Sequence, residues 1–548
     1  MHRESAAFPA VDRHVSARAV RCERSWRLST AWLIPVIAAA SFLQALGIAL
    51  RLAQTSDSAQ GFVVAHAMVR GNFLLSGWHF PVDDYYFTDT FPYAALEWIA
   101  GARPFLLALV PALTYALFVL AALVVCVRSV ETTDKKWTAL AVVSLLLGAP
   151  AWIGDWNPLL LSDMHMATIV GAFAVLVLCA RIGDREQSRL TVCVALPIIV
   201  ALTLASDPFA LVFAYGPALV LLLIDFFRRR SRRAPAALLC LIIGIALGAT
   251  LPFVFASLGG FTVENDVATS PIPGSLLLRN LLSMAAGIFT LFGITPALHS
   301  GVHGLALLVL RSAGFLMVVV SIARVARNLV ARMPLLDRLL CAGILTDLVA
   351  CAASAQFAKG IPAHSIWAGG PPMRFLMPTF LFGAFLAGRQ IPAMVSALRN
   401  GRIRRLATAF AVSFAAILLA VGGWLSGVNS QPCWMYDNPP AAIAGWLERH
   451  GLSQGVGEYW SANLLTAMSG NRVEVRSVVP LEGKLLPYVW VTDARSYARV
   501  PQFMIWQDEN KTGVTLAQVR ASFPVCRMEQ IGRFRIALLA TTCTNSVA

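Results

Sequence analysis

The chain has 548 residues, of which 57% are hydrophobic and 13% are charged, and its mean hydropathy is +0.68. A soluble globular domain carries about 25% charged residues, so this composition excludes a chain that is soluble and globular throughout. About eleven apolar runs reach the roughly 18 residues that an α-helix needs to cross a bilayer. The sequence therefore predicts a polytopic α-helical membrane protein.

The net charge of +15 follows membrane topology and does not indicate a nucleic-acid partner. Six basic segments between apolar runs hold 26 Lys or Arg against 9 Asp or Glu, whereas the segments that alternate with them hold 6 against 10. Basic loops face the cytoplasm. We therefore expect a cytoplasmic N-terminus and, after an odd number of spans, an extracytoplasmic C-terminal tail, as in a multi-pass protein of the bacterial inner membrane. The basic segments are 1–30, 128–137, 181–189, 225–234, 322–338 and 389–405.

A membrane domain is predicted over residues 31–427, after a basic leader of 30 residues. The leader is long for the n-region of a signal peptide, so we expect the first apolar run to remain as an anchor. Two outside loops are long, 52–103 and 257–304. In the second loop, Ser275 to Ile294 would break the charge alternation if it crossed, so we expect a helix lying in the outer interface. The expected spans lie near 31–51, 104–127, 137–153, 165–180, 190–206, 208–224, 235–256, 305–323, 337–357, 374–388 and 406–427.

The tail, residues 428–548, is predicted to be a separate α/β domain outside the membrane, because its apolar runs shorten to strand length. Asn438 caps a first helix that has prolines in its first turn, and Gly451 ends it. A hairpin is expected to turn at Gly532. The remaining expected elements are strands at 453–457, 472–479, 486–493 and 499–507 and helices at 462–469 and 515–523.

Three cysteines, Cys433, Cys526 and Cys543, lie in this tail, where the compartment permits a disulfide. A turn at Gly532 places Cys526 opposite residues near 538, several positions short of Cys543. Cys433 is therefore expected to form the bridge, with Cys526 or Cys543 as its partner. We expect Cys526, because a strand interior is better fixed than a frayed C-terminus.

Acidic residues gather in loops that share the predicted outer face. Because the spans beside these loops end at the same side of the membrane, a compact bundle brings their side chains towards one vestibule. A carboxylate there can act as a general base towards a hydroxyl group. The alternatives are a helix-capping role for Asp163 and Asp207 and a solvated loop for the others. The residues are Asp57, Asp83, Asp84 and Asp89 in the first loop, Asp163 and His165 in the next outside loop, and Asp207.

The first outside loop resembles that of the bacterial GT-C membrane glycosyltransferases, which include aminoarabinose transferases and protein O-mannosyltransferases. The resemblance covers about 40 residues: an acid after the first span, a GN-x-L-L-x-GW segment from Gly71 to Trp78, and an acidic and aromatic run that ends in Pro-Tyr. It implies that Asp57 is the catalytic acid and that Asp84 and Asp89 contribute. From their place at the same face, Asp83, Trp78, Asp163 and His165 are expected to bind substrate. The family often has a second acid beside the first, whereas Ser58 follows here, so the choice of base among these acids stays open.

The same resemblance implies a polyprenyl-phosphate-linked sugar as donor, whose phosphate requires cationic partners at the outer face. Arg374 is the first candidate for the residue that binds the donor phosphate, since a guanidinium binds phosphate bidentately. Arg279 on the interfacial helix is a second candidate, and headgroup snorkelling is the alternative for both residues. The partners expected are membrane lipid and lipid-linked sugar, with a glycan, lipid or protein as acceptor. No metal motif is recognised, and a divalent cation is compatible with the site.

Two other function classes are considered. Transporters and channels carry ionisable groups near the bilayer midplane, whereas only Arg311 and Asp347 are deep here. The second class is a non-catalytic scaffold of the cell envelope. The acids at one face favour a glycosyltransferase.

Overall fold

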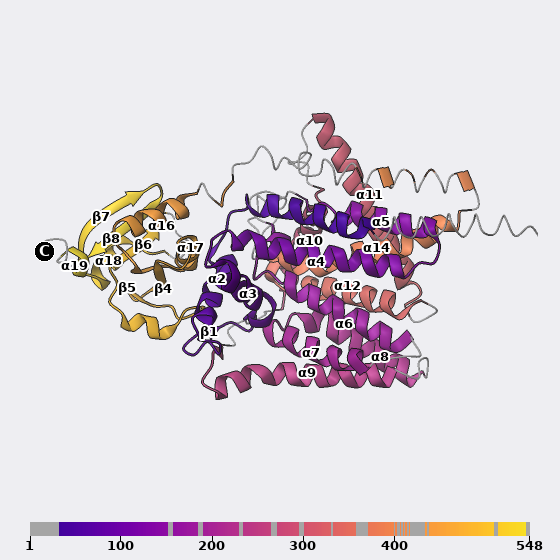
Figure 1. Cartoon of the computed structure of the whole chain (residues 1–548), viewed down its shortest axis with the longest axis horizontal. Coiled ribbons are helices and arrows are strands. Elements are labelled where there is room, and N and C mark those ends of the chain that lie inside the picture. The colour runs from indigo at the N-terminus through magenta and orange to yellow at the C-terminus, as the bar shows by residue number, and fades with distance from the viewer. Residues whose placement is uncertain are drawn as a thin grey trace, which may run out of the picture.

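The computed structural model shows a helical bundle with a mixed sheet domain at one end (Figure 1). In the figure most bundle helices run side by side, and α2, α3 and β1 lie where the bundle meets the tail domain. The structure describes residues 32–151, 157–184, 190–228, 234–264, 271–294, 301–329, 333–357, 371–398, 401–402, 406, 409, 412–413, 416, 433–435, 438–508 and 513–543.

Helices occupy ten of the eleven predicted spans, and most of the last, 406–427, lies outside the described residues. Five helices of the described chain are long and apolar enough to cross a membrane, so the mostly helical membrane architecture is confirmed, whereas the count of eleven stays a prediction. The bundle helices are Trp32–Ala49, α4 (Leu106–Arg128), α5 (Thr133–Leu147), α6 (Met166–Asp184), α7 (Leu190–Ser206), α8 (Gly216–Phe227) after the π-helical turn η3 (Leu211–Tyr215), α9 (Ala234–Ser257), α11 (Gly301–Ala326), α12 (Leu335–Ala353) and α14 (Met377–Ser396) after the 3₁₀ turn η7 (Pro371–Leu376).

Small residues let α7 and α9 pack closely. A Cβ atom on Gly244 would lie 2.6 Å from Cβ of Val200, and one on Gly248 would lie 2.9 Å from the carbonyl oxygen of Ala201. Glycines four residues apart bring helix backbones together in membranes, where van der Waals packing replaces the hydrophobic effect as the driving force.

The apolar stretch of the second long loop forms α10 (Leu277–Leu291). Its Asn280 side chain donates to the carbonyl oxygen of Cys351, at the C-terminal end of α12. At its other end, Gly293 lies beside Ala151, which follows α5. In the predicted topology α5 and α12 both end outside, so these contacts support a helix along the outer face, although α10 is also apolar enough to cross.

The first long loop folds into α2 (Ser56–Val69), β1 (His79–Phe80), the π-helical turn η1 (Tyr86–Thr90) and α3 (Phe91–Ala100). Strand β1 pairs in parallel with β2 (Thr262–Val263) from the second long loop. The two loops are therefore joined at the face where the predicted acids lie.

The tail contains a six-stranded sheet in the order β5-β4-β3-β6-β8-β7, in which β3 lies parallel to β4 and β6 and the outer pairs are antiparallel. The helix capped by Asn438 and the hairpin at Gly532 are confirmed. The strands are β3 (Gln454–Glu458), β4 (Glu474–Leu481), β5 (Lys484–Pro487), β6 (Phe503–Gln507), β7 (Val525–Ile531) and β8 (Phe534–Leu539), and the helices are α16 (Pro439–Arg449), α17 (Tyr459–Met468), the 3₁₀ turn η9 (Ala494–Ala498), α18 (Leu516–Ser522) and α19 (Ala540–Cys543).

The strand predicted over 486–493 is wrong beyond Pro487, because the following residues pair with the first loop instead of the sheet. Val491 N–H donates to the carbonyl oxygen of His79 at 2.7 Å, and Ala494 N–H donates to that of Gly77 at 2.8 Å. Gly77 has a φ of 85°, and a Cβ there would lie 2.6 Å from Oδ1 of Asp493. Only glycine suits this backbone conformation at so close a contact.

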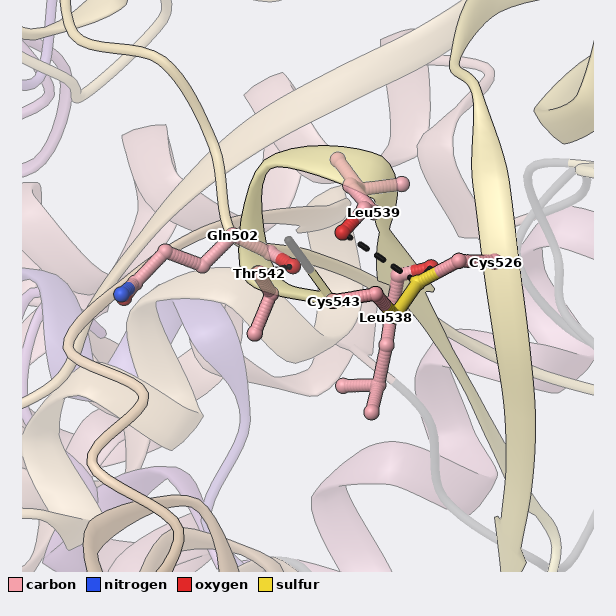
Figure 2. Close-up of a disulfide and its surroundings, with 6 residues drawn as sticks. All are labelled: Gln502, Cys526, Leu538, Leu539, Thr542 and Cys543. Carbon is pink, nitrogen blue, oxygen red and sulfur yellow. Dashed lines mark hydrogen bonds between the residues drawn. A yellow bond between two sulfur atoms is a disulfide. The ribbon is translucent and has the colours of Figure 1, made fainter. Parts of the chain in front are cut away.

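The predicted bridge between Cys433 and Cys526 is wrong. The disulfide joins Cys526 to Cys543 with a Cα–Cα distance of 6.5 Å (Figure 2), and Cys433 is a free thiol. Two features bring these residues together. The hairpin register shifts at Cys526, and the chain turns into α19 after Leu539, which returns Cys543 to β7. Cys433 instead directs its Sγ towards the carbonyl oxygen of Leu50 at 3.5 Å.

Non-reducing peptide mapping by mass spectrometry is expected to recover Cys526 linked to Cys543 and Cys433 as a thiol. A bridge that closes a loop this short stabilises a domain by about 3 kcal/mol in the chain-entropy model. Cys543→Ser is therefore expected to lower the unfolding temperature of the tail, whereas Cys433→Ser leaves the disulfide intact. A peptide containing Cys433 linked to Cys526 would contradict the structure.

Candidate active site

A cavity of about 870 Å³ lies where the bundle helices meet the tail domain. The bundle contributes the start of α6, the end of α7 with η3, the end of α12 and η7, while the first loop and the tail close the opposite side. The predicted site residues at this cavity are Asp57, Asp83, Asp163, His165 and Arg374. The structure thus brings together side chains that are more than 300 positions apart in the sequence.

A hydrogen-bonded network connects two acids through a tyrosine and a histidine. The Tyr85 hydroxyl donates to Asp83 Oδ2 at 3.2 Å and lies 3.1 Å from Nδ1 of His165, which also lies 2.7 Å from Asp207 Oδ2. His165 is 98% buried, and its Nε2 has no hydrogen-bond partner among the described residues.

The backbone is strained at this network. Tyr85, Asp163 and His165 have φ angles of 51°, 57° and 69°, in the left-handed region that non-glycine residues seldom adopt. Such conformations cost of order 1–3 kcal/mol each and cluster at functional sites, where the surrounding structure holds them. In this cavity they direct the three side chains into one place.

Asp89 and Asp163 form a buried acidic pair, of which Asp163 lines the cavity. The N–H of Asp163 donates to Asp89 Oδ1 at 3.4 Å, and the N–H of Gly61 donates to Asp163 Oδ2 at 2.9 Å. Oδ2 of Asp89 and Oδ1 of Asp163 have no partner among the described residues. Burial raises the pKa of Asp89 to about 6, and burial with the charge of Asp89 raises that of Asp163 well above its usual value.

Asp57 lies in the first turn of α2, directly against the tail domain. Thr55 caps this helix by accepting from the N–H of Ser58, which leaves the Asp57 carboxylate to turn towards the cavity. Its Oδ1 accepts a hydrogen bond of 2.6 Å from the hydroxyl of Tyr459 in the tail. The Ser56 hydroxyl donates to the carbonyl oxygen of Tyr459 at 2.5 Å, so two adjacent residues fix this contact.

Arg374 reaches the cavity from η7 on the bundle side. Its guanidinium lies 5.0 Å from the centre of the Phe375 ring, and Nη1 lies 3.7 Å from Sδ of Met164. The charges of Arg374 and His165 both counteract the raised pKa of Asp83, for which burial is the main cause. No carboxylate of the described chain forms an ion pair with Arg374. Its positive charge is therefore available to an anionic ligand.

Other predicted site residues lie away from the cavity. Asp84 is buried and accepts from the N–H of Tyr86 at 2.8 Å, which is a turn-stabilising role, and burial raises its pKa. Trp78 stacks on Phe80 within an apolar cluster. Arg279 on α10 does not line the cavity.

Asp207 was named with the outer-face acids, with helix capping as the alternative, and it has both contacts: its Oδ1 accepts from the N–H of Phe209 at 3.1 Å, and its Oδ2 lies 2.7 Å from Nδ1 of His165. Sequence reasoning missed other residues at the cavity. Tyr85 carried no signal beyond the aromatic run around it. The tail adds Tyr459, Trp460, Tyr488 and Trp490. Their grouping depends on how the tail docks, which local pattern does not reveal.

The raised pKa of Asp89 predicts a pH-dependent stability. Because the folded state favours the neutral form, Asp89 contributes stability that is full below pH 4 and is lost as the pH rises through about 6. A shift of about two units corresponds to about 3 kcal/mol at most. Asp89→Asn is expected to reduce the loss of thermal stability between pH 5 and pH 8, measured by unfolding of the purified protein. Asp508→Asn, a surface control, should keep the parental pH dependence, and parallel curves for Asp89→Asn and the parent would contradict this assignment.

No protein-family model and no curated protein matches the sequence. Solved structures do match. A crystal structure of ArnT from Cupriavidus metallidurans in the apo state superposes with a TM-score of 0.53 over 94% of this chain and 99% of that chain, at 12% identity. The structure of the same protein bound to undecaprenyl phosphate superposes with a TM-score of 0.54 and the same coverage and identity. The chain has the fold of ArnT.

ArnT is a GT-C aminoarabinose transferase, so the resemblance inferred from the first loop is confirmed for the fold. The match to ArnT covers bundle and tail together, since nearly the whole of both chains superposes. The archaeal oligosaccharyltransferase AglB from Archaeoglobus fulgidus, in complex with an inhibitory peptide and a dolichol-phosphate, gives a TM-score of 0.46 at 12% identity, over 88% of this chain and 70% of that chain.

Proposed function

We propose that the protein is an integral membrane glycosyltransferase that moves a sugar from a polyprenyl-phosphate donor to an acceptor at the extracytoplasmic face. The cavity carries this proposal, because it combines several carboxylates with an unpaired guanidinium at one end of an ArnT-like bundle. The solved ArnT structure with undecaprenyl phosphate shows that a protein of this fold binds a lipid carrier.

In the proposed reaction Asp57 is the general base. Its carboxylate takes the proton of an acceptor hydroxyl, and the freed oxygen forms a bond to the anomeric carbon of the donor sugar. The bond between that carbon and the phosphate oxygen breaks, and its electron pair leaves on the polyprenyl phosphate. Tyr459 holds Oδ1 of Asp57, and among the described residues no group bonds Oδ2, which is then free to accept the proton.

Arg374 is proposed to hold the donor phosphate through its guanidinium. A guanidinium stabilises the negative charge that grows on the leaving phosphate, in a cavity where water is partly excluded. The neighbouring wall is apolar, since Phe209, Val212, Phe357 and Phe375 line it. Such a wall suits the first isoprene units of a lipid carrier.

The transporter alternative receives no support from the deep charges. The Arg311 guanidinium donates to the carbonyl oxygen of Ala149 at 2.9 Å, and Asp347 accepts from the Thr379 hydroxyl at 2.6 Å. Both groups therefore have partners within the bundle.

Among the described residues, no three His, Cys, Asp or Glu side chains are grouped as a metal site.

Binding of the carrier tests the donor assignment. Native mass spectrometry of the purified protein with undecaprenyl phosphate is expected to show one bound lipid in the parent and a large loss of binding in Arg374→Ala. Arg103→Ala, at the end of the first loop and away from this cavity, is the matched control. Equal binding by all three proteins would exclude Arg374 as the phosphate ligand.

The proposed orientation places the cavity outside the cytoplasm. Reporter fusions after Arg230 and at the C-terminus are expected to report cytoplasm and exterior, respectively, because the basic segments face inwards. The reverse pattern would put the cavity at the cytoplasmic face and would overturn the proposed reaction.

A further inference from the structure

The tail domain contributes an aromatic wall to the cavity, directly beside the proposed base. Tyr459, Tyr488 and Trp490 line the cavity on this side. Tyr459 packs edge-on against Tyr488, with ring centres 5.4 Å apart, and its plane lies 28° from that of Trp490 at 6.4 Å. The three rings therefore pack against one another on this side of the cavity, with Tyr488 edge-on to the other two.

The wall is held rigidly in place. On one side, the hydroxyl of Tyr459 bonds Asp57. On the other, Trp490 forms a bridge with His79, and the next residue, Val491, donates to the carbonyl oxygen of His79. Because the tail and the first loop are joined at both points, the aromatic surface and the proposed base keep a fixed relation.

The two sides of the cavity differ in chemistry. The bundle side combines phenylalanine and valine side chains with Arg374, His165, Asp163 and Asp207, whereas the tail side places aromatic rings beside the carboxylate of Asp57. Aromatic faces pack against the C–H faces of a sugar ring, and carboxylates accept hydrogen bonds from its hydroxyls.

We propose that this wall, formed by Tyr459, Tyr488 and Trp490, binds the acceptor and that the acceptor is a carbohydrate whose ring packs on it. The inference rests on the proposed function, because the base must lie within hydrogen-bond reach of the hydroxyl that it deprotonates. A ring held against Tyr459 presents its hydroxyl to Asp57. The oxygen of that hydroxyl then bonds to the anomeric carbon as its proton moves to Asp57 and the phosphate leaves.

Steady-state kinetics separate acceptor from donor. Trp490→Ala is expected to raise the KM for a carbohydrate acceptor roughly tenfold, since an aromatic contact contributes up to about that factor, and to leave the KM for the polyprenyl-phosphate sugar unchanged. Trp490→Phe should restore most of the loss. The control is Trp446→Ala, because this tryptophan lies on α16, where it stacks on His450. A rise in the KM for the donor alone would show that the wall holds the donor sugar and would overturn the proposal, as would no change in either constant.

A binding measurement distinguishes failure of this inference from failure of the proposed function. Saturation-transfer NMR of the purified full chain with a panel of neutral disaccharides is expected to show transfer to ring C–H protons in the parent and in Asp57→Asn, and weak transfer in Trp490→Ala. This result does not require turnover. The same transfer in the parent and in Trp490→Ala, or none in the parent, would overturn the carbohydrate wall even if Asp57 and Arg374 prove essential for transfer.

Discussion

Asp57→Asn is expected to lower turnover by about 10² to 10⁴, the range for loss of a general base. Asparagine preserves the size of the side chain and can still accept from Tyr459, so the tail should remain docked on α2. The KM for the donor should change little, because the proposed phosphate ligand lies on the other side of the cavity. The measurement is transfer of radiolabelled sugar by the purified protein, with initial rates at saturating donor.

Two variants accompany this experiment. Asp508→Asn, a surface substitution in the tail, should keep parental turnover. Asp83→Asn distinguishes Asp57 from the other acid on the same side of the cavity: if Asp83→Asn abolishes transfer while Asp57→Asn remains close to the parent, the base is Asp83. If neither acid matters, the acidic cavity is not a site of proton transfer.

Arg374→Ala is expected to lower kcat/KM for the donor by about 10² or more, because removing one partner from a buried, charged contact costs 2–5 kcal/mol. Both kcat and the KM for the donor should change, since the guanidinium binds the ground-state phosphate and stabilises the charge that develops on it. Arg374→Lys should recover only part of the activity, because an ammonium group keeps the charge but loses the bidentate geometry.

Arg279→Ala is the comparison that the structure supplies. Both arginines were predicted as phosphate ligands from the sequence, but only Arg374 lines the cavity. Activity of Arg279→Ala is therefore expected to stay within about threefold of the parent, as for most surface substitutions. If Arg279→Ala loses transfer activity while Arg374→Ala keeps it, the donor phosphate does not bind at the cavity described here.

The helical domain could be predicted from sequence because the signal is local. An apolar run of sufficient length defines each helix, and the basic segments orient it. Short apolar helices such as α7 and the interrupted segment η3–α8 fall below the length criterion alone. Their place in the bundle depends on packing against neighbours, for example α7 against Gly244 and Gly248 of α9.

The sequence could predict which side chains lie close together, because residues near the ends of spans on one face of a bundle must be neighbours. Asp57, Asp83, Asp163, His165 and Arg374 line one cavity for this reason. The sequence did not distinguish Asp83 from Asp84, since adjacent residues in a loop can turn either way. Only the folded backbone shows that Asp83 faces the cavity and that Asp84 bonds Tyr86.

Contacts between distant segments account for the remaining differences. The bond from Tyr459 to Asp57 spans 402 positions, and no periodicity encodes it. The disulfide partner was mispredicted because a hairpin with regular register was assumed, whereas a register shift and the turn into α19 bring Cys543 back to Cys526. Such irregularities arise from tertiary packing and have no strong local signal.

The most direct test of the central claim is release of polyprenyl phosphate from an undecaprenyl-phosphate-linked sugar by the purified protein in liposomes, in the presence of a carbohydrate acceptor. The account predicts release of the carrier together with a glycosylated acceptor in the parent, and neither product above background in Asp57→Asn. Release at the same rate by the parent and by Asp57→Asn, or no release by the parent with any lipid-linked sugar, would contradict the assignment of this cavity as a glycosyl-transfer site.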